Sequence, residues 1–171
     1  DKSTNIKKIS RLVFKKRISL DFLFKTLYCQ IRNKSMPLKE KYISINNNYD
    51  LEKIMEKKKP KYVILFRAGL IINKNILNLK IPLINIHCAR LDGFGGLGSI
   101  YKALKKEVFD QCATAHIVTE KIDEGKIIAE MPFKLNPNIS YCKNELIAFK
   151  TGGDLLQILL NNDKKISLKD L

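Results

Sequence analysis

Three polar residues stand where two predicted strands end, and their side chain types suit acid–base chemistry. Asn85 and His87 lie at the end of the segment 84–87, and Asp123 follows the segment 116–119. Open α/β sheets place their ligands and reacting groups beyond the ends of their strands. An amide, an imidazole and a carboxylate gathered there can hold a polar reactant and move a proton. The pattern therefore predicts an enzyme.

Each of these residues also has a simpler interpretation. Asn85 could form a turn, His87 could be a hydrogen-bonded core histidine, and Asp123 could be a turn residue before Gly125. Their order and spacing together favour the functional interpretation. The second histidine, His116, lies within a strand pattern, and we expect its role to be structural.

The elements that must position these residues follow an alternating pattern from residue 37 onward. Apolar runs and turn residues predict strands at 42–45, 62–66, 82–86, 113–119 and 126–135, and helices at 49–58, 73–79, 99–106 and 144–160. The run 62–66 is typical of a strand buried on both faces, and the last helix should bend or break at Gly152-Gly153. We expect an α/β fold with a Rossmann-like, open, mostly parallel sheet and helices on both faces.

The first part of the chain has a different pattern. Apolar residues recur at helical spacing from Ile6 to Asn33, and Ser19 is a candidate N-cap for the second of two helices. We expect one domain over 1–171, with a basic helical segment at 1–36 and an α/β catalytic core at 37–171. The basic segment could pack on the sheet, or bind RNA or a membrane surface.

Composition limits the partners of the chain. Its 171 residues are 45% hydrophobic, and no apolar run is long enough to cross a bilayer, so we expect a soluble, cytoplasmic protein. The net charge of +15 comes mostly from scattered lysines, which are weak evidence for a surface that reads nucleic acid, so a nucleic-acid partner is not the first expectation, whereas anionic small molecules suit this charge. The four cysteines lack CxxC spacing, so no metal site is expected.

A longer motif carries a resemblance to a known family. Asn-x-His at a strand end is followed by a glycine-rich loop, a helix ending in Ala-Leu, and His-x-Val-Thr-x-x-x-Asp-x-Gly. Over roughly residues 61–160 this order resembles the folate-dependent formyltransferases, nearest to the phosphoribosylglycinamide formyltransferase branch. The resemblance implies formyl transfer from 10-formyltetrahydrofolate to the primary amine of a small phosphorylated acceptor. Glycinamide ribonucleotide, a purine precursor, is the first candidate, and the oligomeric state stays open.

The resemblance also implies roles for particular residues. Asn85 and His87 would form an oxyanion hole for the formyl oxygen, and Asp123 would favour the charged imidazole and relay a proton through water. The folate would lie between two loops, whose expected contacts are Ala68, Gly69, Leu70, Ile71, Val118, Thr119 and Ile122. Leu70 and Ile71 could equally be core residues.

Two features depart from the family pattern. The loop after His87 carries Asp92 where the family usually has proline, so the contacts with the acceptor are open. Gly95, Gly96 and Arg90 are candidates for binding an acceptor phosphate, although a plain flexible turn is the alternative. The strand that opens the family's fold has no match here, and we expect it to be missing.

Other functions remain open. An amino-sugar nucleotide could be the acceptor instead. Formylation of methionyl-tRNA and hydrolysis of formyltetrahydrofolate belong to relatives with an additional domain that we do not find. From another class, the chain could be a non-catalytic relative that binds polyanions through its lysines, in which case binding would weaken steeply with salt.

Overall fold

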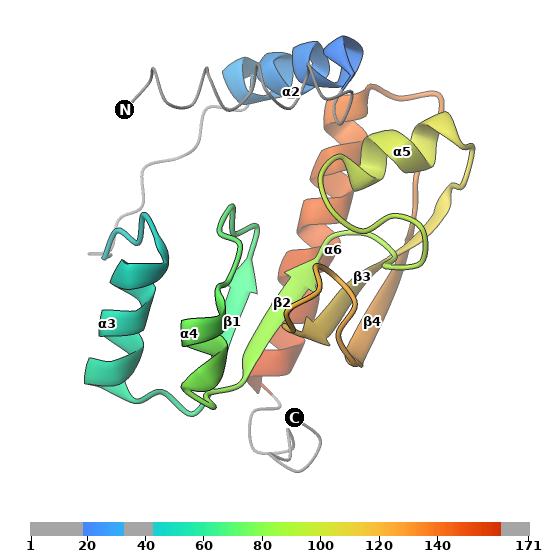
Figure 1. Ribbon diagram of the computed structural model, residues 1–171. Coiled ribbons are helices and arrows are strands. Elements are labelled where there is room, and N and C mark those ends of the chain that lie inside the picture. Colours follow the sequence, from blue (N-terminus) through green and yellow to red (C-terminus); the bar gives the residue numbers. More distant parts are fainter. Residues whose placement is uncertain (1–18, 33–42, 162–171) are drawn as a thin grey trace. The chain divides into compact units, whose positions relative to one another are not determined.

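The computed structural model describes residues 19–32 and 43–161 (Figure 1). The chain divides into two compact units, residues 1–40 and 41–171. The first unit contains helix α2 (Leu20–Arg32). The Ser19 hydroxyl accepts a hydrogen bond from the Phe22 N–H at 3.2 Å, which confirms the expected helix start. The other expected N-terminal helix lies outside the described residues, and the single-domain organisation stays a prediction.

The second unit contains the remaining described elements. They are α3 (Asn48–Lys58), β1 (Val63–Phe66), α4 (Lys74–Asn78), β2 (Leu83–His87), α5 (Ser99–Lys105), β3 (Asp110–Ile117), β4 (Ile127–Lys134) and α6 (Tyr141–Asn161). Sequence signals explain several boundaries. Asn47 caps α3 by accepting a hydrogen bond from the Asp50 N–H, and Lys59 ends that helix in a left-handed conformation at φ 44°. Asn73 caps α4 in the same way.

The strands form one sheet in the order β1-β2-β3-β4. Strands β1 and β2 pair in parallel, whereas β2 with β3 and β3 with β4 pair antiparallel. The α/β class and the open sheet are therefore confirmed, but the expectation of a mostly parallel sheet is wrong. Among the described elements, β1, α4 and β2 form the one crossover between parallel strands. The short link between β3 and β4 permits only antiparallel pairing.

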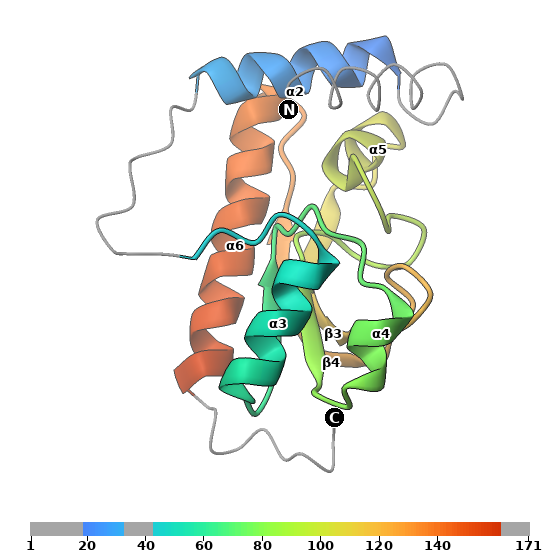
Figure 2. The same ribbon diagram turned by 60° about the vertical axis from the view of Figure 1, so that its left-hand side comes forward.

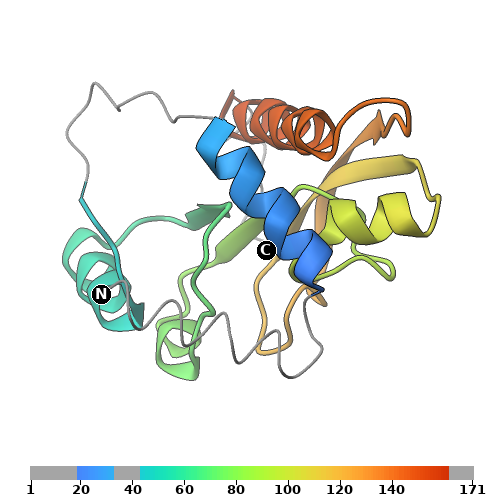
Figure 3. The same cartoon turned by 90° about the horizontal axis from the view of Figure 1, so that it is seen from above.

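Helices cover both faces of the sheet, as expected. Ile84 and Ile86 of β2 pack against Leu155 and Leu159 of α6 on one face. On the other face Leu83 belongs to a cluster with apolar residues of α3 and α4: Leu51, Met55 and Ile76. Figures 2 and 3 show α6 on one side of the sheet and α3 and α4 on the other. Successive strand residues alternate between faces, so this packing determines which β2 side chains are free for a site.

Helix α6 runs for 21 residues without interruption, so it is not broken at its glycines, where we expected a bend or a break. Gly152 serves close packing instead. A Cβ at this position would lie 2.7 Å from Cys88 Sγ and 3.0 Å from Phe66 Cε2. A Cβ at Gly153 would meet open space.

Two strand predictions also need correction. Residues 43–46 have no regular structure, Ile43 and Ile45 are 67% and 43% exposed, and no described strand pairs with this segment. Residue 42 lies outside the described residues. Strand β1 is half-buried along its length and not buried on both faces, since it forms an edge of the described sheet. In the described part of the chain, no helix has the length and apolarity of a membrane span.

The two glycines of α6 give a matched pair for a stability test. We expect Gly153→Ala to raise the free energy of unfolding by about 0.5–1 kcal/mol, because alanine restricts the unfolded chain and favours helix. Gly152→Ala should be about 1–3 kcal/mol less stable than Gly153→Ala, because its methyl group overpacks the contact with Cys88 and Phe66. Urea unfolding of both variants measures the difference. Equal stabilities would contradict the packing described for Gly152.

Candidate functional site

Strand β2 presents Asn85 and His87 on one face. They alternate with Ile84 and Ile86, whose side chains are buried against α6. The antiparallel register places His116 of β3 directly opposite Asn85 and Thr114 opposite His87. Directly opposite residues of an antiparallel pair project to the same face, so β3 supplies a second histidine beside the amide.

The loop between β3 and β4 brings Asp123 to these side chains. Asp123 adopts a left-handed conformation at φ 56°, which aspartate tolerates better than most residues. Two positions later, a Cβ at Gly125 would lie 1.7 Å from the Ile117 carbonyl oxygen, so only glycine permits this return of the chain. Asp123 is thus a turn residue and a site residue at once.

The Asp123 carboxylate contacts the other polar side chains of the site. Its Oδ1 lies 3.3 Å from Asn85 Nδ2 and 3.3 Å from His116 Nε2. Its Oδ2 accepts a hydrogen bond from the Gly96 N–H at 2.7 Å and lies 3.5 Å from His87 Nδ1. The predicted set of Asn85, His87 and Asp123 therefore gathers in space.

We expected a structural role for His116, and the structure places this residue in the same cluster. Its Nε2 lies 3.1 Å from Asn85 Nδ2, and its Nδ1 lies 3.0 Å from the Ile117 carbonyl oxygen. A carbonyl only accepts, so Nδ1 carries a proton. The sequence predicts that His116 lies in a strand. That it lies beside Asn85 depends on the register between β2 and β3.

The glycine-rich loop before α5 contacts the carboxylate. Besides the Gly96 hydrogen bond, Gly95 lies against Asp123, because a Cβ there would be 3.2 Å from Asp123 Cβ. Lys102 of α5 holds the loop by donating to the Gly95 carbonyl at 3.0 Å. Arg90 pairs instead with the exposed Asp92, at 4.0 Å between Nη2 and Oδ2. Of the three residues predicted to bind an acceptor phosphate, only the two glycines lie at the cluster.

The surroundings shift the pKa values of both partners in the His87–Asp123 contact. The hydrogen bond from His116 lowers the pKa of Asp123 most, the Gly96 N–H adds to it, and the value falls to about 2 despite burial. Burial lowers the pKa of His87 and outweighs the opposing effect of the carboxylate. At neutral pH the site therefore holds an ionised Asp123 beside a neutral His87.

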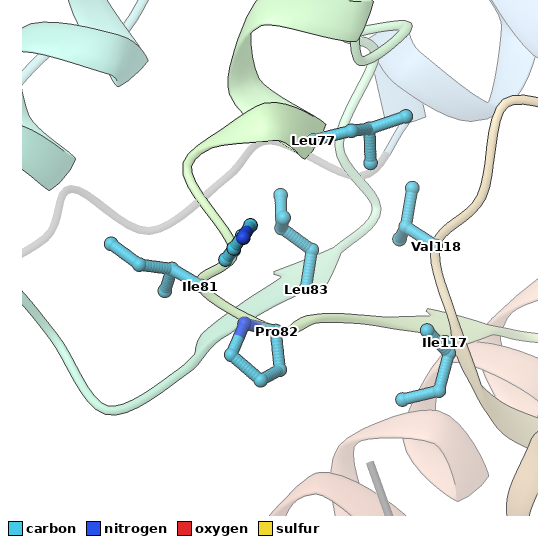
Figure 4. A pocket seen from close by; sticks show the side chains of 7 residues that line it. Leu77, Ile81, Pro82, Leu83, Ile117 and Val118 are labelled. Carbon is cyan, nitrogen blue, oxygen red and sulfur yellow. The ribbon is translucent and has the colours of Figure 1, made fainter.

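A pocket of about 210 Å³ opens beside the start of β2 (Figure 4). Its lining is apolar apart from one lysine and consists of Leu77, Lys80, Ile81, Pro82, Leu83, Ile117 and Val118. The Val118 N–H donates to the Leu83 carbonyl at 2.8 Å and so closes one wall. Val118 is the one residue that the pocket shares with the expected folate contacts.

The other expected folate contacts lie on two loops. Leu70 packs partly buried on the α3–α4 cluster, and Ile71 is 72% exposed. The Asn48 side chain holds the loop that contains Leu70 and Ile71 by donating a hydrogen bond to the Ile71 carbonyl at 2.9 Å. Ile122 is 61% exposed, beside Asp123.

Within the described ranges, no group of three histidine, cysteine or acidic side chains could hold a metal ion.

Acid unfolding tests the geometry around Asp123. Its pKa is lower in the folded protein than the ordinary 3.8, so the carboxylate stabilises the fold above about pH 4, and this stabilisation is lost as the pH falls towards about 2. The contribution is roughly 2 kcal/mol. We expect Asp123→Asn to lose correspondingly less stability than wild type between pH 5 and about pH 2, measured by urea unfolding.

Asp92→Asn is the matched control, because the Asp92 side chain is 93% exposed. It should keep the wild-type dependence of stability on pH. An unchanged pH dependence in Asp123→Asn would contradict the buried hydrogen bonds assigned to this carboxylate.

Comparison with known proteins identifies the family of this chain. A family model described as formyl transferase matches residues 25–143, which include all four polar residues of the cluster. No curated protein sequence matches the chain. Among solved structures, the phosphoribosylglycinamide formyltransferase of Streptococcus pneumoniae TIGR4 is 22% identical, with a TM-score of 0.59 over 66% of this chain and 63% of that one.

Two further solved structures share the fold. The phosphoribosylglycinamide formyltransferase of Campylobacter jejuni subsp. jejuni NCTC 11168 is 22% identical, with a TM-score of 0.57 over 70% of this chain and 65% of that one. A formyltetrahydrofolate deformylase from Pseudomonas syringae pv. tomato str. DC3000 is 22% identical, with a TM-score of 0.56 over 67% of this chain and 40% of that one. This chain thus spans less than two thirds of each of these relatives. The family model covers more than half of the 171 residues, and the chain belongs to the formyl transferase family.

Proposed function

We propose that this protein transfers a formyl group from 10-formyltetrahydrofolate to the primary amine of a small phosphorylated acceptor. The observation that carries the proposal is the cluster of Asn85, His87 and His116 around the Asp123 carboxylate in a member of this family. Glycinamide ribonucleotide is the first candidate acceptor, because two phosphoribosylglycinamide formyltransferases share the fold.

The chemistry explains why these groups are needed together. The amine nitrogen bonds to the formyl carbon, the bond from that carbon to folate N10 breaks, and one proton passes from the amine to N10. Negative charge grows on the formyl oxygen during the attack. Fixed N–H donors directed at such an oxygen usually supply the largest single catalytic effect. We assign this role to the Asn85 amide and to the Nδ1–H that His87 carries when its imidazole is protonated.

The Asn85 amide can exchange a hydrogen-bond partner at a small cost in free energy. Its Nδ2 lies 3.1 Å from His116 Nε2 and 3.3 Å from Asp123 Oδ1. Both distances exceed the usual 2.9–3.0 Å for such bonds, so neither contact is strong. An incoming formyl oxygen can accept one amide hydrogen while the other stays donated to Asp123 Oδ1.

We assign Asp123 to charge stabilisation more than to proton abstraction. Its pKa of about 2 keeps the carboxylate ionised but makes it a weak base. An ionised carboxylate beside His87 stabilises the imidazolium and the cationic amine that form during attack. Water at the carboxylate would carry the amine proton towards N10.

The apolar pocket suits part of the formyl donor. A flat ring gains most from an apolar slot with a few polar groups at its edge, and backbone groups near Val118 can supply these. The folate supplies the formyl group and the leaving nitrogen. The contacts with Ala68, Gly69, Leu70, Ile71, Thr119 and Ile122 remain part of this proposal, with Arg90, Gly95 and Gly96 on the acceptor side.

Two other activities are alternatives for this site. Transfer to an amino-sugar nucleotide would use the same attack of an amine on the formyl carbon. Hydrolysis has support from the similarity to a formyltetrahydrofolate deformylase, since water would then take the place of the amine. The excess of positive charge, +15 overall, favours an anionic acceptor in either transfer reaction.

The proposal predicts the kinetics of variants. We expect the protein to release tetrahydrofolate from 10-formyltetrahydrofolate when an amine acceptor is added. Asn85→Ala, His87→Ala and Asp123→Ala should each lower the rate by about 10²–10³, because each removes a group that acts in the transition state. The double variant His87→Ala/Asp123→Ala should be little slower than either single variant. Absorbance follows folate release with glycinamide ribonucleotide and with an amino-sugar nucleotide.

Lys134→Ala is the control, because its ion pair with Asp110 is exposed and far along β4 from the site. It should release folate at the wild-type rate. Release that needs no acceptor would assign the site to hydrolysis. Equal rates in wild type and Asp123→Ala would contradict the proposed mechanism.

A further inference from the structure

Ser99 is the first residue of α5, and its hydroxyl does not cap the helix. The N-cap is Gly98, in a left-handed conformation at φ 73° and without a side-chain cap. A serine at the N-cap usually satisfies a free backbone N–H of the first turn, but Ser99 is one residue past the cap. Ser99 is only 8% exposed and directs its hydroxyl back into the glycine-rich loop. A buried hydroxyl that does not cap a helix must form its hydrogen bonds with other groups.

The partners of this hydroxyl define the direction of each hydrogen bond. Ser99 Oγ lies 2.8 Å from the Gly96 carbonyl oxygen and 3.0 Å from His87 Nε2. The carbonyl can only accept, and a serine hydroxyl has one hydrogen to give. Ser99 therefore donates to Gly96 and accepts from His87, which requires a proton on Nε2.

A second acceptor favours the same protonation. The Phe94 carbonyl oxygen lies 3.4 Å from His87 Nε2, so an unprotonated Nε2 would face it with a lone pair. The other ring nitrogen, Nδ1, lies 3.5 Å from the carboxylate of Asp123. The charged groups that act on the ring are Asp123 from the β3–β4 loop, His116 of β3 and Lys102 of α5. Among the described acidic side chains, Asp123 is the one within 4.0 Å of this ring.

Gly96 joins this serine to the carboxylate. Its carbonyl accepts from Ser99, and its N–H donates to Asp123 Oδ2 at 2.7 Å. A closed ring of polar contacts therefore runs from His87 through Ser99 and Gly96 to Asp123 and back to His87. A shift of either side chain would break a contact of the other.

We propose that Ser99 is a positioning residue that holds the His87 proton on Nε2 and leaves Nδ1, facing Asp123, as the nitrogen that gains and loses a proton. Ser99 itself touches no reacting atom. Its effect on formyl transfer rests on the proposed function, whereas its effect on the imidazole does not.

Nuclear magnetic resonance of the free protein tests the imidazole directly. The chain has two histidines, so ¹⁵N-histidine labelling gives two rings, and His116→Gln assigns them. In the neutral wild-type ring we expect the Nε2–H form to dominate. In Ser99→Ala the ratio of Nε2–H to Nδ1–H should fall about fivefold, equivalent to one hydrogen bond of about 1 kcal/mol.

Conservative variants and a control separate positioning from folding. Ser99→Thr keeps a hydroxyl and should keep the wild-type ratio, and Ser99→Cys, with a weaker acceptor, should give an intermediate ratio. Ser44→Ala, which removes an exposed hydroxyl in residues 43–46, should leave the ring signals unchanged. A wild-type ratio in Ser99→Ala or in Ser99→Cys would overturn the proposal.

The kinetic readout then connects the imidazole to catalysis. We expect Ser99→Ala to lower kcat roughly tenfold with little change in KM, and Ser99→Thr to restore it, because misorientation of a reacting group slows the chemical step. If wild type showed no formyl transfer while the tautomer ratio shifted as expected, the proposed function would fail and the role of Ser99 in positioning His87 would stand. A rate loss in Ser99→Ala without a change in the ratio would overturn that role.

Discussion

The Asp123 carboxylate is the interaction on which the arrangement of the site depends. One side chain links β2 through Asn85, β3 through His116 and the glycine-rich loop through Gly96. A buried carboxylate is costly unless hydrogen bonds and opposite charge compensate it. The low pKa of Asp123 shows that they do so here, with His116 as the largest contributor. Removing any one partner would therefore disturb the others.

The fold supplies this arrangement through packing on both faces of the sheet. Ile84 and Ile86 anchor β2 to α6, and this leaves the alternate positions 85 and 87 for polar side chains on the opposite face. Gly152 lets α6 lie close to the end of β2, at Cys88, where the site begins. Gly125 permits the return of the β3–β4 loop that carries Asp123. Two glycines thus determine where the polar groups meet.

Much of this could be predicted from the sequence, because local signals determined it. The Ser19 cap, the end of α3 at Lys59 and the alternation in β2 are properties of neighbouring residues. The contacts of His116 and Ser99 with the cluster could not be predicted, since they depend on the β2–β3 register and on the path of the loop. The expected strand at 42–45 failed for a similar reason, because alternation makes a strand only where another strand lies beside it.

In the proposed function, this cluster moves a formyl group from a folate to an amine. The most direct measurement uses 10-formyltetrahydrofolate labelled with ¹³C in the formyl carbon and follows that carbon by nuclear magnetic resonance in the presence of glycinamide ribonucleotide. We predict a new formamide signal on the acceptor that grows with wild type and is strongly reduced in Asp123→Asn. Label that appears only as formate, or a formamide signal that grows equally fast in Asp123→Asn, would contradict the account.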